Sequence, residues 1–81
     1  MTIQQLEHYK SSFATHFQDY ILIADLDSGH NLIAYATPYC NFEEIVMEVC
    51  EGLPDTIDFN DHLSIYLYQF GRNEYVRIGI N

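Results

Sequence analysis

Basic residues are scarce in this chain. Only 3 of its 81 residues are Lys or Arg, against 12 Asp and Glu, so the formal charge is −9. Such a charge repels nucleic acid phosphates and anionic membranes, and it attracts basic protein surfaces. The composition therefore disfavours direct nucleic acid or membrane binding and favours a basic protein partner. The alternative interpretation is that the charge only keeps a small protein soluble.

Long apolar runs are also lacking. No run approaches the roughly 18 residues of a membrane span, and no basic segment followed by an apolar run opens the chain. We therefore expect a cytoplasmic protein. The only two cysteines, Cys40 and Cys50, stand near the two ends of a predicted helix, roughly 15 Å apart. A disulfide requires Cα atoms within about 7 Å, so both thiols should be free.

The rest of the composition is that of a folded domain. Hydrophobic residues make up 48% of the chain and include 7 Tyr and 5 Phe. A chain of this length buries roughly 60% of the surface that its unfolded form exposes. We expect one compact α+β domain over residues 1–81, without a deep cleft.

Local signals predict six elements. Capping residues, apolar periodicity and turn residues indicate helices over Ile3–Gln18 and Asn41–Glu51, with strands over Tyr20–Leu26, Leu32–Thr37, Leu63–Phe70 and Tyr75–Ile80. The order is αββαββ. Two hairpins should join into one four-stranded antiparallel sheet, with both helices on its aliphatic face in a two-layer arrangement. The alternative is a three-layer fold in which the first helix covers the aromatic face.

The second predicted helix has two different sides. Its apolar residues recur at helical spacing and should point inward: Phe42, Ile45, Val46, Val49 and Cys50. Its acidic residues follow at i, i+4 and i+7 on another side, and the acidic series continues past the helix: Glu44, Glu48, Glu51, Asp55, Asp58 and Asp61. Because no Lys or Arg lies between Asn41 and Gly71, this side should be strongly negative.

An extended negative array can imitate a phosphate strand. Carboxylates about 6 Å apart on a helix are spaced more coarsely than the phosphate repeat of about 3.4 Å, so the imitation would be approximate. In size and charge the chain resembles the small acidic inhibitors that phages encode against restriction, CRISPR or repair proteins. Composition carries this resemblance, and no motif does. The hypothesis is a non-enzymatic inhibitor whose acidic helix and loop occupy a basic, nucleic-acid-binding surface of a partner protein.

The third and fourth strands carry an aromatic strip of Tyr66, Tyr68, Phe70 and Tyr75. Such a strip could stack unpaired bases, but of the basic residues only Arg77 accompanies it, whereas single-strand grooves combine aromatic residues with several cations. A protein interface or burial under the first helix explains the strip better. The alternative function is therefore a self-assembling module that dimerises through this face.

Motifs for chemistry are weak. No short chelating pair links His8, His16, His30 or His62 to another His or Cys, and the aspartate loop lacks the spacing of an EF-hand. Cys40 precedes a helix and could act with His62 and a nearby acid, but acidic neighbours disfavour its thiolate. Cys50 should be a core thiol that reacts only after unfolding. We predict no catalytic residue, metal or cofactor; a small metal- or thiol-dependent enzyme is the third alternative.

Overall fold

The computed structural model describes residues 2–53 and 63–80. It contains two helices and a four-stranded sheet: α1 (Ile3–His16), β1 (Ile21–Leu26), β2 (Leu32–Ala36), α2 (Phe42–Gly52), β3 (Leu63–Gln69) and β4 (Tyr75–Ile80). The α+β class and the αββαββ order are confirmed. Element ends coincide with the predicted ones or differ by one or two residues, which is the usual uncertainty where helices and strands fray.

Side-chain caps begin both helices. The Thr2 hydroxyl accepts a hydrogen bond from the Gln5 backbone N–H, and the Gln5 side chain accepts one from the Thr2 N–H. At α2, Asn41 Oδ1 accepts from the N–H groups of Glu43 and Glu44 at 2.9 and 3.3 Å. These bonds satisfy N–H groups that the first helical turn leaves without partners. In the described part of the chain, no helix has the length and apolarity to cross a membrane.

The sheet is mixed, and this corrects the antiparallel sheet expected from the sequence. The strand order is β1-β2-β3-β4, with antiparallel pairing within each hairpin but parallel pairing between β2 and β3. The length of the connection allows this pairing. Antiparallel neighbours can be joined by a short hairpin, whereas parallel neighbours need a crossover of a dozen or more residues. The 26 residues between Ala36 and Leu63, which include α2, meet that requirement.

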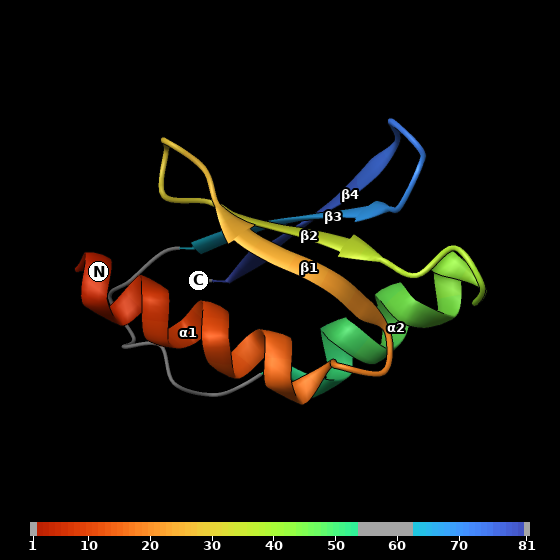
Figure 1. Ribbon diagram of the computed structural model, residues 1–81, viewed down its shortest axis with the longest axis horizontal. Coiled ribbons are helices and arrows are strands. Elements are labelled where there is room, and N and C mark those ends of the chain that lie inside the picture. The colour runs from red at the N-terminus through yellow and green to blue at the C-terminus, as the bar shows by residue number, and fades with distance from the viewer. Residues whose placement is uncertain (1, 54–62, 81) are drawn as a thin grey trace.

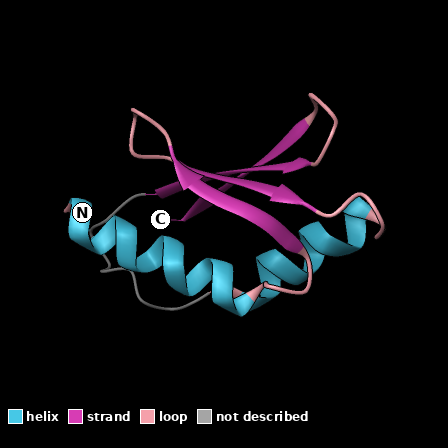
Figure 2. Cartoon of the chain, viewed as in Figure 1, coloured by secondary structure: helices cyan, strands magenta, loops and turns pink. Residues whose placement is uncertain are grey.

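Both helices lie on one side of the sheet, as Figures 1 and 2 show, and the core lies between the two layers. From the helices the core takes Leu6, Tyr9, Phe13, Ile45 and Val49, and from the sheet Leu32, Ala34, Leu63, Ile65 and Leu67. All are at most 4% exposed. The two-layer arrangement is therefore correct, and neither described helix covers the opposite face of the sheet.

Candidate functional site

The acidic side of α2 forms part of the lining of a small surface hollow. Glu44, Glu48 and Glu51 are exposed and line a cavity of about 210 Å³. The other lining residues are Tyr20, Cys40, Asn41, Ile45 and Met47. Pockets for drug-sized ligands are typically about 300–1,000 Å³, so this hollow suits a single side chain better than a small-molecule substrate. We refer to the three glutamates and the hollow as the acidic surface.

The charges of the acidic surface destabilise α2, the helix that carries them. Glu44 and Glu48 are four residues apart and Glu48 and Glu51 three apart, and like charges at these spacings destabilise a helix by about 0.2–0.5 kcal/mol per pair. Glu51 also lies in the last turn, where the helix dipole favours cations, and that turn contains no basic residue. Only the two acids of the first turn, Glu43 and Glu44, are well placed for the dipole.

The rest of the predicted acidic series cannot be placed. Asp55, Asp58 and Asp61 lie outside the described residues, as does His62, which the sequence suggested as a partner for Cys40. The structure therefore brings together Glu44, Glu48 and Glu51 and adds Tyr20 and Met47, which sequence reasoning missed. Met47 is 60% exposed between two acidic positions of an amphipathic helix, a signal that was readable in the sequence.

Cys50 is exposed, so the prediction of a core thiol is wrong. The buried stripe of α2 is narrower than expected: Ile45 and Val49 are buried, whereas Phe42 and Val46 are only partly so. Cys50 is turned about 100° round the helix from Val49 and leaves the stripe. Cys40 is also exposed, and both thiols are free.

The aromatic strip lies on the sheet face that neither described helix covers, which we call the open face. Tyr66 and Tyr68 are half-buried there, and Phe70 and Tyr75 are exposed. The Tyr68 ring lies 5.4 Å from Tyr35 in a stacked arrangement and 5.2 Å from Tyr75. Sequence reasoning missed Tyr35, although strand β2 alternates small and bulky residues and so indicates two different faces.

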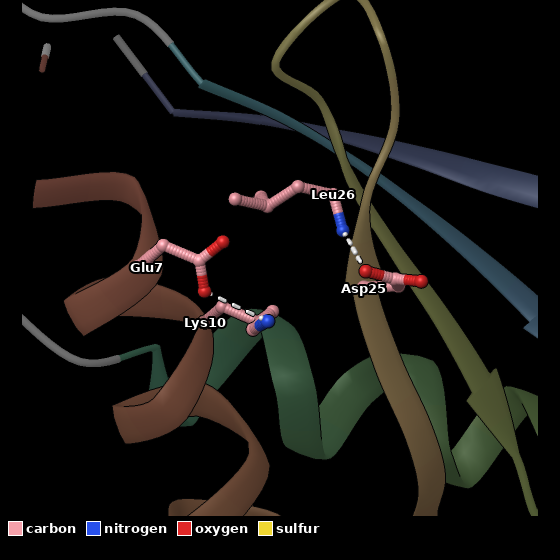
Figure 3. Close-up of polar contacts among 4 residues, drawn as sticks. All are labelled: Glu7, Lys10, Asp25 and Leu26. Carbon is pink, nitrogen blue, oxygen red and sulfur yellow. Dashed lines mark hydrogen bonds and ion pairs between the residues drawn. The ribbon is translucent and has the colours of Figure 1, made fainter. Parts of the chain in front are cut away.

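Other polar groups offer little chemistry. Lys10 forms an ion pair with Glu7 at 2.8 Å along α1, and in Figure 3 the carboxylate of Asp25 points away from this helix. Burial raises the pKa of Tyr9 to about 12. Over residues 2–53 and 63–80, no three His, Cys, Asp or Glu side chains come together as metal ligands would. Two surfaces therefore stand out in the described part of the chain: the acidic surface and the open face.

Comparison with protein-family models, curated proteins and solved structures finds no match for this chain.

Proposed function

We propose that this protein is a non-enzymatic binding protein that inhibits a partner by placing the acidic surface of α2 against a basic, nucleic-acid-binding surface. The observation that supports this most directly is the arrangement of Glu44, Glu48 and Glu51 around one hollow. By its size and charge the chain is proposed to be of the nucleic-acid-mimic, phage anti-defence type.

The hollow suggests how one basic side chain would bind. The exposed Met47 and the half-buried Tyr20 offer apolar surface for the stem of an Arg or Lys side chain. The three carboxylates would then surround its cationic end, and Arg in particular pairs with carboxylates through two parallel hydrogen bonds. In this proposal the protein binds one cationic side chain of the partner in the hollow and attracts the rest of the basic surface through its wider negative charge.

The cost of the acidic surface to α2 also supports a role in binding. A helix selected for stability alone would place lysines among its glutamates and a basic residue in its last turn. This helix does neither. Residues that break a local stability rule without evident compensation are common at functional sites. We propose the cytoplasm as the compartment, because its reducing conditions suit two exposed free thiols.

Competition with DNA tests the proposal. The immobilised protein is incubated with lysate of its source cells, with and without excess duplex DNA, and the association rate of each captured protein is then measured at several salt concentrations. We expect DNA to displace the partner, and association to slow steeply as the Debye length falls from about 10 Å at 0.1 M salt to about 3 Å at 1 M.

Variants of α2 test whether its glutamates cause the fast association with the partner. Replacing Glu44, Glu48 and Glu51 together by Gln keeps the side-chain shape, and by Lys reverses the charge; association should slow at least roughly ten-fold with Gln and further with Lys. Glu43→Lys, on the same helix but outside the hollow, is the matched control and should change the rate far less. A partner that binds DNA and this protein together, with neither weakening the other, would show that the two do not share a site.

A further inference from the structure

The open face is a continuous apolar surface. It carries the side chains that point away from the helices on all four strands: Ile23 of β1, Ile33 and Tyr35 of β2, Tyr66 and Tyr68 of β3, and Tyr75 of β4. Ile23 is 48% exposed and Tyr75 52%, and Phe70, at the end of β3, is 48% exposed. Large exposed apolar patches on soluble domains mark interaction surfaces.

Strand pairing arranges this face in two rows. One row runs Ile23, Tyr35, Tyr68, Tyr75 across the four strands. The other runs Asp25, Ile33, Tyr66, Arg77. The second row therefore has an acid at one edge of the sheet, a base at the opposite edge and apolar side chains between them. Arg77 is also held over this face, because its Nε and Nη2 donate to Ser64 Oγ at 3.3 and 3.0 Å.

This row makes the face complementary to itself. A two-fold axis parallel to the strands, running between β2 and β3, places β1 of one copy opposite β4 of the other. Asp25 of each copy then faces Arg77 of the other, and both charge pairs form at once. We propose that the open face binds the open face of a second copy of this chain about that axis.

The apolar positions agree with the same axis. It places Ile33 opposite Tyr66 of the second copy and Tyr35 opposite Tyr68 of the second copy, and these apolar pairs lie beside the axis. Stacked sheets pack about 10 Å apart with their strands rotated by about 30°. Asp25 and Arg77 lie about 7 Å from the axis, so this rotation displaces them by about 4 Å, which a long arginine side chain can span.

The charge of the face favours a second copy over a nucleic acid. Sites that stack bases add several cations to their aromatic residues, whereas the two rows carry only Arg77, offset by Asp25. Both helices lie on the other side of the sheet from the open face, below the sheet in Figure 1, so a dimer leaves the acidic surface of each copy exposed. The dimer therefore neither requires the proposed function nor prevents it.

The size of the face sets the expected affinity. Four strands at about 4.8 Å and six residues at about 3.3 Å cover roughly 400 Å² of flat area per copy. Stable interfaces bury about 800 Å² per partner, so this one is about half the standard size and belongs with the weak, transient interfaces. We expect a dissociation constant in the micromolar range, on the order of 1–100 µM.

Reversing the charge of Asp25 in one variant and of Arg77 in another tests the proposed dimer. Asp25→Arg alone sets two arginines opposite each other at both charged positions, and Arg77→Asp alone sets two aspartates opposite each other. Sedimentation velocity should show dimerisation weakened at least roughly ten-fold in each variant. An equimolar mixture should associate nearly as well as the wild type, because every charged position then faces its opposite. The double variant Asp25→Arg/Arg77→Asp should behave like the wild type.

Control variants show whether weaker dimerisation comes from this interface or from a change in net charge or folding. Asp19→Arg, the same charge change in the exposed loop after α1, should leave the dissociation constant unchanged, and circular dichroism should show every variant folded. Tyr68→Asp places a charge near the axis and should give monomers. A wild type still monomeric at about 1 mM, or variants that do not restore each other when mixed, would overturn the proposal. Binding of a single-stranded oligonucleotide that Tyr68→Asp abolishes, by a monomeric wild type, would assign the face to nucleic acid instead.

Discussion

Tyr9 should weaken the fold through its hydroxyl group, and removing that group should stabilise the protein. The side chain is 2% exposed in the core under the sheet, and its hydroxyl has no hydrogen-bond partner among the described residues. A buried polar group without a partner costs about 1–3 kcal/mol. Tyr9→Phe keeps the ring, so we expect it to raise the free energy of unfolding by about 1 kcal/mol at pH 7. This corresponds to a Tm increase of about 4–8 °C for a domain of this size.

The same substitution should change the response to alkali. Burial raises the pKa of Tyr9 from 10.0 to about 12, since the low-dielectric core disfavours the phenolate. Because the pKa is raised in the folded state, the unfolded chain loses this proton at a lower pH than the folded protein does. The ionisation of Tyr9 therefore leaves the free energy of unfolding unchanged below pH 10 and lowers it between pH 10 and 12. Two pKa units correspond to at most about 2.7 kcal/mol. The stability advantage of Tyr9→Phe should therefore grow over this interval.

Urea unfolding followed by circular dichroism measures both effects. Wild type and Tyr9→Phe are compared at one protein concentration, at neutral pH and at several pH values above 9, because dimerisation would make stability depend on concentration. Tyr39→Phe is the matched control, since it removes the same hydroxyl group from a side chain that is 94% exposed. Destabilisation by Tyr9→Phe at pH 7, or an advantage independent of pH, would refute the reasoning.

Two further predictions concern the cysteines and the first hairpin. Both thiols are exposed, so Cys40 and Cys50 should each react with a disulfide reagent in the native protein. The Cys40→Ser variant retains only Cys50, and a reaction of this variant only in denaturant would contradict the exposure of Cys50. Asp27 accepts hydrogen bonds from the N–H groups of Gly29 and Asn31 and from the Asn31 side chain, which lower its pKa. Its contribution to stability should be lost as pH falls through that lowered pKa, and Tm profiles in acid should show this loss in the wild type but not in Asp27→Asn.

The acidic surface could be read only in part from the sequence. The spacing of Glu44, Glu48 and Glu51 places them together on any helix, because 3.6 residues make a turn. That Met47 and Tyr20 complete a hollow beside them depends on where the chain before β1 lies against α2, and no local pattern contains that information. The exposure of Cys50 was missed for a similar reason, since the width of a buried stripe depends on what packs against it.

The order of elements followed from local signals, because caps, turns and apolar periodicity act over a few residues. Thr2 and Asn41 begin the helices, and Gly71, with φ +86°, turns the second hairpin. The direction of β3 beside β2 was decided only in the tertiary structure, because the 26 residues between Ala36 and Leu63 are enough to connect the two strands in either direction. Together with the registers of the two hairpins, that parallel register sets Asp25 and Arg77 in one row. Contacts between residues distant in sequence depend on the whole chain, and they determine which side chains share a surface.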